Sequence, residues 1–445
     1  MKKWLIGILL AAFCLFAGCQ PQETPVERAW SAGFGVATLE LPADSEQPLY
    51  IAGYHNGWQI TGVLDLQQAR ALWLDDGAAS LLLIAVDCVG LDSGTVAQIR
   101  QELSGFCRET GCDSVNVVST HTHAGVDTLG LWGPVAINGK NEDFMQILIR
   151  GAVAAAKDAY ADRCRGTLHY VATPTEALQE DSRDPQVCDS NIYQLRFQPE
   201  DPEKNGIRLI SFAAHAEALR GDNTLVSRDY PGAVCDIVTA ETGDDALYVP
   251  GAIGGLIMTP RLKEDPVVNL QITAQRIANR VLAAKQGREL PPGIGLSRVE
   301  FETELDNTLF QYYKFLGILG NPVEQNLSGA YMLSTELTLI RLGDVTLALL
   351  PGEIFPELVS GTGAEEDPPA LKALAKDYGV EDLVIIGLAN DEIGYILPPS
   401  EFLLDHDLPY LQEAEGDHYE ETNSVGPDCA RDLTEAFEEA LDALE

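Results

Sequence analysis

The segment SVNVVSTHTHAG, residues 114–125, is a short run rich in β-branched residues that ends in a His-x-His pair. Such a run favours a β-strand. The alternation of side chains along a strand aims His121 and His123 toward the same side. In α/β proteins, chemistry is usually assembled at the edge of the sheet where strands end. The segment therefore predicts one strand of an α/β sheet, with a candidate site directly after it.

Three further apolar runs carry a residue that can bind zinc at or just beyond their ends. The runs are IRLISFAAHAE, TLALLPGE and DLVIIGLANDEIGY, and the residues are His215, Glu353 and Tyr395. Zinc favours imidazole nitrogen and carboxylate oxygen, and a catalytic site keeps one position for water or substrate. A lone histidine is usually a surface or satisfied core residue, but three of the seven histidines lie at strand ends. The pattern predicts a mononuclear zinc site. Both residues of His-x-His need not be ligands, because one can handle protons instead.

The whole chain predicts one large α/β domain with a mixed β-sheet core flanked by helices. Its 445 residues, 46% of them hydrophobic, are enough for a packed core, and no linker divides the chain. Apolar periodicity predicts helices over 96–106, 144–152, 266–287 and 433–444, and apolar runs predict strands over 81–86, 115–118, 209–214, 345–350 and 383–388. Alternating helices and apolar strands favour helices packed on a central sheet.

The N-terminus, MKKWLIGILLAAFCLFAGC, has two lysines, a short apolar stretch and small residues before Cys19. This pattern predicts a lipoprotein signal peptide over residues 1–18 and lipidated Cys19 as the first residue of the mature protein. Residues 19–30 are then a polar tether, and the protein is extracytoplasmic and lipid-anchored to a bacterial membrane. The alternative is an ordinary cleaved signal with an incidental cysteine.

Charge and cysteine content exclude several classes of protein. The formal net charge is −39, so nucleic acid is not an expected partner, because phosphate binding needs basic patches. The acidic residues favour a solvated surface. The sequence has no Cys-x-x-Cys pair, which disfavours cysteine zinc sites and thioredoxin-like chemistry. Cys107 and Cys112 are close enough in sequence for a local disulfide.

Five motifs in sequence order carry a family resemblance. They are THTHAG (120–125), FAAH (212–215), PGE (351–353), GLANDEIGY (387–395) and HYEETNSVGP (418–427). Together they resemble the motif set of the neutral/alkaline non-lysosomal ceramidases, over roughly residues 31–430. The resemblance implies a ceramidase-like zinc hydrolase domain over 31–445, similar to the N-terminal domain of that family and without its C-terminal immunoglobulin-like domain.

The resemblance also implies the roles of the site residues. The zinc ligands are His121, His215, Glu353 and Tyr395, and the catalytic residues are His123, Arg183 and Tyr419. His123 then faces the reaction centre and accepts or relays a proton, while Arg183 and Tyr419 stabilise the oxyanion. The family cleaves the amide of ceramide, which implies Zn²⁺ as cofactor and N-acylsphingosine or a related N-acyl amide as substrate. Other cell-envelope amides and esters remain open.

One segment departs from the family pattern. The family carries a Gly-Asp-x-Ser-Pro stretch with a catalytic serine, whereas this chain reads VPGAIGGLIMTP, with Gly255 at the Asp position and no serine. Thr259 offers a hydroxyl only after a shift in spacing, and otherwise the segment is a glycine-rich loop that shapes the pocket floor. A zinc-activated water needs no serine, because zinc lowers the pKa of bound water to about 7. The alternatives are a zinc-containing binding lipoprotein without catalysis and a purely structural lipoprotein.

Overall fold

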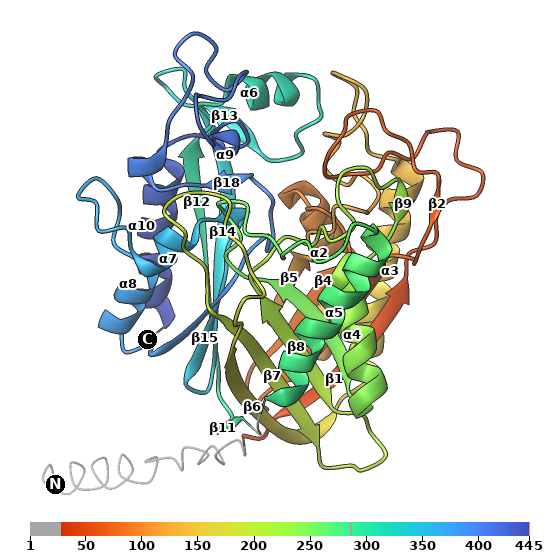
Figure 1. Cartoon of the computed structure of the whole chain (residues 1–445). Coiled ribbons are helices and arrows are strands. Elements are labelled where there is room, and N and C mark those ends of the chain that lie inside the picture. The colour runs from red at the N-terminus through yellow and green to blue at the C-terminus, as the bar shows by residue number, and fades with distance from the viewer. Residues whose placement is uncertain (1–27, 285–286, 445) are drawn as a thin grey trace, which may run out of the picture.

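A computed structural model describes residues 28–284 and 287–444, which form one domain of mixed sheets and helices (Figure 1). The predicted signal peptide, Cys19 and most of the tether lie outside these residues. None of the helices within the described ranges is long and apolar enough to span a membrane. The predicted α/β class is confirmed.

The larger of two main sheets has nine strands in the order β10-β8-β7-β6-β1-β3-β4-β5, with β11 paired to β6. Its strands are β1 Ser31–Thr38, β3 Gln68–Asp75, β4 Ser80–Val86, β5 Ser114–Ser119, β6 Cys164–Pro174, β7 Asn191–Pro199, β8 Ile207–Phe212, β10 Asp245–Pro250 and β11 Arg288–Leu290. The pairs β4 with β5 and β8 with β10 are parallel, and the other pairs are antiparallel. The sheet is therefore mixed, as predicted.

The smaller sheet has five strands in the order β12-β14-β15-β17, with β13 paired to β14. Its strands are β12 Ile294–Glu304, β13 Val323–Gln325, β14 Tyr331–Leu342, β15 Val345–Leu349 and β17 Asp382–Ile386. Because β15 and β17 run parallel, their carboxyl ends lie at the same edge of the sheet. Glu353 and Tyr395 follow these two ends along the chain.

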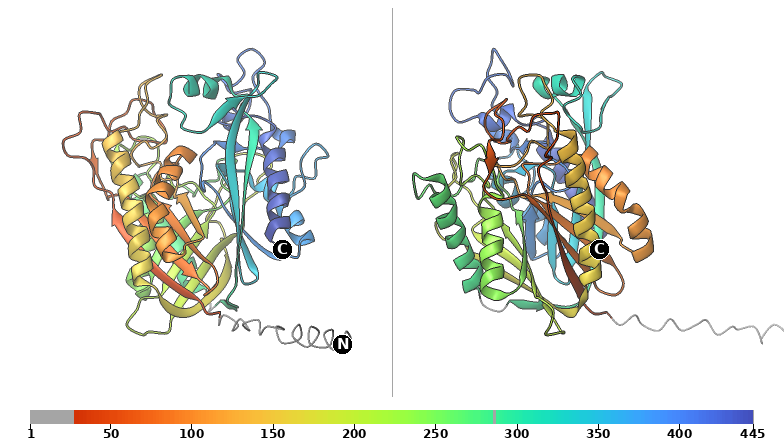
Figure 2. Two further views of the ribbon diagram at one scale, coloured as in Figure 1. Left: turned by 180° about the vertical axis from the view of Figure 1, so that it is seen from behind. Right: turned by 90° about the vertical axis from the view of Figure 1, so that its right-hand side faces the viewer.

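The two sheets pack face to face, and helices cover both outer faces (Figures 1 and 2). The helices on the larger sheet are α2 Ser93–Thr110, α3 Glu142–Asp162, α4 Asp229–Thr242 and α5 Pro266–Ala283, and those on the smaller sheet are α7 Pro356–Ser360, α8 Leu371–Asp377 and α10 Cys429–Leu444. The helices expected over 96–106, 144–152, 266–287 and 433–444 correspond to α2, α3, α5 and α10. The sequence predicted one central sheet, whereas the structure has two main sheets with a core between them.

Strand β4 shows why two sheets are needed. Leu82 and Ile84 belong to the core between the larger sheet and helices α2 and α3, whereas Leu81 and Leu83 belong to the core between the sheets. All four side chains are at most 3% exposed. A strand that is apolar on both faces must be covered on both, because each exposed leucine side chain forgoes about 1.5–3 kcal/mol of hydrophobic stabilisation. The smaller sheet covers the face that the helices leave open.

Candidate metal centre

Two histidine segments meet beyond the ends of β5 and β8. Thr122 and Ala216 form a parallel bridge, so the segment His121-Thr-His123 runs in register beside His215-Ala-Glu217. His121 has φ 64°, in the left-handed region that few residues other than glycine adopt. Its ring centroid lies 4.8 Å from that of His215. The pairing brings together two imidazoles that are 94 positions apart in the sequence.

Glu353 and Tyr395 reach the same point from the smaller sheet. They are direct partners in a two-stranded parallel ladder formed by β16 (Glu353–Ile354) and β18 (Tyr395–Ile396). Glu353 Oε2 lies 2.9 Å from His215 Nε2 and 3.5 Å from His121 Nε2, and the Tyr395 hydroxyl lies 3.4 Å from His215 Nε2. Ligand atoms around a tetrahedral zinc, with bonds of about 2.0–2.2 Å, lie roughly 3.4 Å apart. The four predicted ligands therefore converge with separations that fit one metal ion.

The backbone fixes both imidazoles with Nε2 toward the centre. His121 Nδ1 donates to the carbonyl of Val89 at 2.6 Å, and His215 Nδ1 donates to that of Ile257 at 2.9 Å. This is the usual outer-shell support of metal-binding histidines, because it sets the tautomer and leaves the Nε2 lone pair free. Ile257 belongs to the glycine-rich segment 251–260. This segment therefore supports His215 at Nδ1, on the side of the ring away from Nε2. None of its residues line the site pocket.

Charge in this cluster favours an ionised Glu353 carboxylate. Burial alone raises the pKa of Glu353, but His121 and His215 outweigh burial, and the pKa lies well below its usual range. Burial alone lowers the pKa of His215, but its contact with Glu353 outweighs burial and raises it. In Tyr395, burial and the Glu353 charge raise the pKa of the phenol, which therefore stays protonated without a bound cation. The carboxylate is thus ready to bind a positive charge.

His123 is the third imidazole of the cluster. Its Nε2 lies 3.0 Å from Nε2 of His121, and one nitrogen from each of His121, His123 and His215 lies within 4.8 Å of the others. These three histidines could hold a metal ion. Burial, together with the neighbouring imidazoles, keeps the pKa of His123 well below its usual range, so the ring is neutral at pH 7. Its assignment as the proton acceptor stays a prediction, because the ring is also close enough to be a ligand.

Arg183 and Tyr419 occupy different environments. The Arg183 guanidinium is buried and donates to Glu420 at 3.0 Å and to Glu421 at 2.9 Å, and it is not among the residues lining the site pocket. Those two carboxylates belong to α9 (Tyr419–Thr422). Tyr419 does line the pocket, with its ring 6.1 Å from that of Tyr395. Arg183 therefore anchors the short helix that carries Tyr419, and its contact with substrate stays a prediction.

Thr259 is buried beyond the pocket. It is 2% exposed, and its hydroxyl has no hydrogen-bond partner among the described residues. It does not line the site pocket. Gly255, at the position of the family's Asp, has φ 73°, a conformation that suits glycine. The Thr259 hydroxyl is therefore not exposed to the pocket beside the candidate centre.

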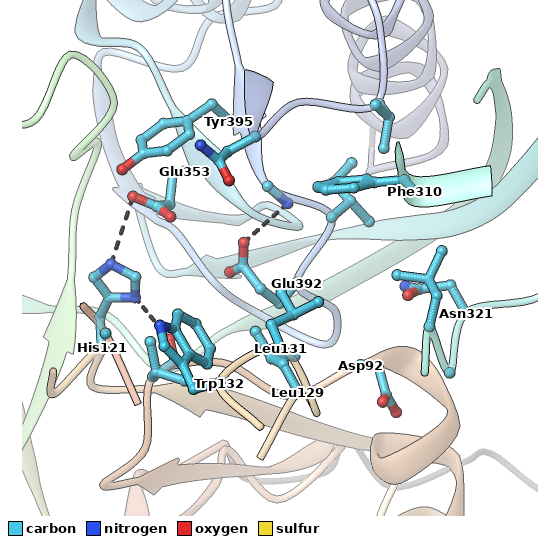
Figure 3. A pocket seen from close by; sticks show the side chains of 18 of the residues that line it. Asp92, His121, Leu129, Leu131, Trp132, Phe310, Asn321, Glu353, Glu392 and Tyr395 are labelled. Atoms are coloured by element: carbon cyan, nitrogen blue, oxygen red, sulfur yellow. Dashed lines mark hydrogen bonds and ion pairs between the residues drawn. The ribbon is translucent and has the colours of Figure 1, made fainter. Parts of the chain in front are cut away.

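A pocket opens beside the candidate metal centre (Figure 3). The end of the pocket at this centre is lined by His121, His123, Glu353, Tyr395 and Tyr419. Its apolar wall includes Leu129, Leu131, Trp132, Phe310, Leu319 and Leu333. An apolar cavity with a few convergent polar groups is the usual form of a small-molecule site.

The sequence did not predict that Glu217 lies beside His123 at this site. Glu217 Oε2 lies 3.9 Å from His123 Nδ1 and accepts a hydrogen bond from the Tyr54 hydroxyl. A carboxylate at this position can orient the imidazole. The available signal was the spacing, because Glu217 follows His215 at the same interval by which His123 follows His121. Only the register of the two segments turns that spacing into a contact.

Two solved structures with a similar fold are described as ceramidases. The crystal structure of neutral ceramidase from Pseudomonas aeruginosa superposes with a TM-score of 0.74 at 15% identity, covering 94% of this chain and 74% of that one. A ceramidase structure described as complexed with C2 gives 0.71 at 15% identity, covering 94% and 75%. No protein-family model and no curated protein sequence matches this chain. The resemblance stated from the motifs is therefore confirmed at the level of the fold, which is that of neutral ceramidase.

Proposed function

We propose that this protein is a zinc-dependent hydrolase that cleaves the amide bond of N-acylsphingosine or a related N-acyl lipid. The observation that carries the proposal is the convergence of His121, His215, Glu353 and Tyr395 at the end of an apolar pocket. The shared fold with ceramidases supports the same reaction class. A lipid amide suits the pocket, because its apolar wall can take a hydrocarbon chain while the polar end holds the amide.

A zinc ion at this centre supplies a Lewis acid and a water of lowered pKa. The protein side chains have separate tasks. His121, His215, Glu353 and Tyr395 provide the donor atoms of the binding site. His123 is neutral and buried beside them, so its ring can take a proton from the attacking water and pass it to the leaving amine.

Tyr419 supplies the hydrogen bond to the oxyanion in this proposal. Tyr419 is 39% exposed, and its partial burial together with the charges of Glu353 and Glu420 raises the pKa of the phenol to about 12, so the hydroxyl keeps its proton at neutral pH and can donate. A donor positioned at a developing oxyanion is worth roughly 10²–10³ in rate. Arg183 acts by holding Glu420 and Glu421 and hence the helix of Tyr419.

The experiment that tests the reaction starts from the soluble form, residues 20–445, loaded with zinc. The substrate panel contains N-acylsphingosine, N-acylethanolamine, an N-acyl amino acid and a long-chain ester. Release of fatty acid from N-acylsphingosine or another N-acyl lipid, abolished by chelation and restored by zinc, is the expected result. A zinc-loaded protein that binds these lipids without cleaving any of them would instead be a binding lipoprotein.

The proposal includes attachment to a bacterial membrane, outside the cytoplasm, through lipidated Cys19. Its support is the sequence pattern Ala17-Gly18-Cys19. Expression of the full chain with an alkynyl fatty acid should label the wild type, and Cys19→Ser should prevent both labelling and sedimentation with membranes. Equal labelling of the two proteins would contradict the anchor.

A further inference from the structure

Glu392 is a buried carboxyl group in the wall of the site pocket (Figure 3). It lies in the turn between β17 and β18 and is 7% exposed. One oxygen, Oε1, accepts the backbone N–H of Gly394 at 2.9 Å. The other, Oε2, is buried and has no hydrogen-bond partner among the described residues. The side chain therefore has one structural hydrogen bond and one oxygen without any.

The backbone at this position is held firmly by the preceding residue. Asp391 accepts from the Ser93 N–H at 2.7 Å, from the Asn321 amide at 2.6 Å and from the Thr335 hydroxyl at 2.8 Å. These three hydrogen bonds tie the turn to three other segments of the chain. Glu392 is left to face the pocket from a fixed backbone.

A glycine makes room for the side chain. A Cβ atom added at Gly90 would lie 2.7 Å from Cγ of Glu392, closer than atoms can approach without movement. Any side chain at that position would displace the carboxyl group. Cδ1 of Leu129 lies 3.0 Å from the same Cβ position. The absence of a side chain at Gly90 therefore leaves space for the Glu392 carboxyl group beside Leu129.

An acceptor oxygen in such surroundings is costly unless a donor reaches it, because burial removes the water that would otherwise bind it. The pocket opens to solvent at its mouth and to the candidate metal centre at its end, so a molecule that binds there displaces water and can supply the donor. Asn321 also lines the pocket, but its amide nitrogen is already bonded to Asp391.

We propose that Glu392 recognises a hydroxyl group of the substrate, which donates to the free Oε2 while the amide lies at the metal centre. The inference rests on the proposed function and narrows its substrate class to N-acyl amides that carry a hydroxyl group near the amide. The hydroxyl can belong to the amine half, as in an amino alcohol, or to the acyl half, as in a 2-hydroxy acid. Glu392 is thus a specificity-determining residue and takes no part in bond breaking.

A hydroxyl fits this oxygen better than an ammonium group does. A hydroxyl can donate one hydrogen bond to this oxygen and carries no charge. The pocket wall includes the apolar side chains Leu129, Phe310 and Leu333, beside which a neutral group is buried at lower cost than a cation.

The test compares matched amides of equal chain length on the zinc-loaded protein. One pair is an N-acyl amino alcohol and its deoxy analogue, and the second pair is a 2-hydroxyacyl and an unsubstituted acyl amide of the same alkylamine. Wild type should prefer the hydroxylated member of one pair at least tenfold in kcat/KM, and that pair identifies which half carries the hydroxyl. Glu392→Leu should bring the ratio close to one.

Conservative and remote variants separate recognition from a structural effect. Glu392→Gln keeps an accepting and a donating atom, so it should preserve most of the hydroxyl preference. Glu357→Gln alters another buried glutamate with a partnerless oxygen, but outside the pocket, and should leave the ratio unchanged. Zinc content should be equal in all these proteins. An unchanged ratio in Glu392→Leu with zinc retained would overturn the inference.

Failure of the proposed function gives a different result. If wild type cleaves none of the amides, the same four compounds are used as ligands, and their dissociation constants are measured with the zinc-loaded protein. The hydroxylated member of one pair should still bind at least tenfold more tightly to wild type than its analogue does. Equal affinity of both members of each pair would contradict recognition by Glu392 independently of catalysis.

Discussion

His215 Nε2 lies 2.9 Å from Oε2 of Glu353, at the point where the larger and the smaller sheet meet. One residue follows β8 and the other follows β15, so the contact joins the two halves of the fold. The histidine is fully buried and the glutamate is 7% exposed. Because the two residues come from different sheets, the candidate metal centre exists only when both sheets are assembled.

The first prediction concerns metal binding. His121→Ala, His215→Ala and Glu353→Ala should each lower zinc affinity more than ~100-fold, the upper range for loss of a supporting residue, because each removes a donor atom. Elemental analysis after dialysis should find near-stoichiometric zinc in wild type and little in the variants. His406→Ala is the matched control, since that side chain is 99% exposed. Zinc retention in all three variants would refute the site.

The role of His123 is tested by His123→Gln. If the ring transfers protons, kcat should fall roughly 10²–10⁴-fold while zinc content is unchanged. Glu217→Gln should cause a smaller loss, because it only orients the ring. Loss of zinc in His123→Gln would instead make this histidine a ligand, as its position 3.0 Å from His121 allows.

Substitution of Arg183 should mainly lower stability, whereas substitution of Tyr419 should mainly lower the catalytic rate. Arg183→Met leaves two buried carboxylates without their cation, a change that typically costs about 3–5 kcal/mol, so the melting temperature should fall clearly. Tyr419→Phe should lower kcat roughly 10²-fold at an unchanged melting temperature. Both quantities are measured on both variants. A stable Arg183→Met protein with the kinetic defect of Tyr419→Phe would place the guanidinium on the substrate.

Thr259→Ala should keep most of the activity. The hydroxyl is buried, partnerless among the described residues and outside the site pocket, so it has no path to the reacting carbonyl. Steady-state rates and zinc content are compared with those of Thr259→Val, which keeps the shape of the side chain. Complete loss of turnover with zinc still bound would show that a hydroxyl mechanism operates in this protein.

The raised pKa of Glu357 predicts how the stability of the folded protein depends on pH. Burial, together with the charges of Glu401 and Asp181, raises its pKa to about 8 in the folded protein, whereas the unfolded chain titrates near 4.5. The folded state therefore binds the extra proton. The resulting contribution to the free energy of unfolding is complete below pH 4.5 and is lost as the pH rises to 8. The loss is at most about 1.4 kcal/mol per pH unit.

The measurement is the melting temperature of Glu357→Gln and wild type between pH 5 and pH 8. The variant has no proton to lose at this position, so its advantage over wild type should grow with pH across that window. Glu365→Gln, at an exposed position, is the control and should track wild type. A difference that shrinks as the pH rises would contradict the raised pKa.

Much of the fold could be predicted because its signals are local. Asp265 caps α5, Pro266 is its first residue, and an apolar stripe follows at helical spacing. The run LLLIAV lies within β4 as expected. The second sheet was not predicted, because an apolar run shows that both faces of a strand are covered without showing what covers them. Strand pairing depends on contacts between distant segments.

The candidate site, like the fold, has features that the sequence determines and features that depend on the tertiary structure. The sequence by itself determined the donor types and their positions after strand ends, since His121, His215, Glu353 and Tyr395 could be named from motifs. Tertiary structure alone decided that Glu217 faces His123, that Arg183 is enclosed by Glu420 and Glu421, and that Glu392 points into the pocket. The physical reason is that residue type and spacing fix local chemistry, whereas register and sheet packing fix which distant groups share one buried space.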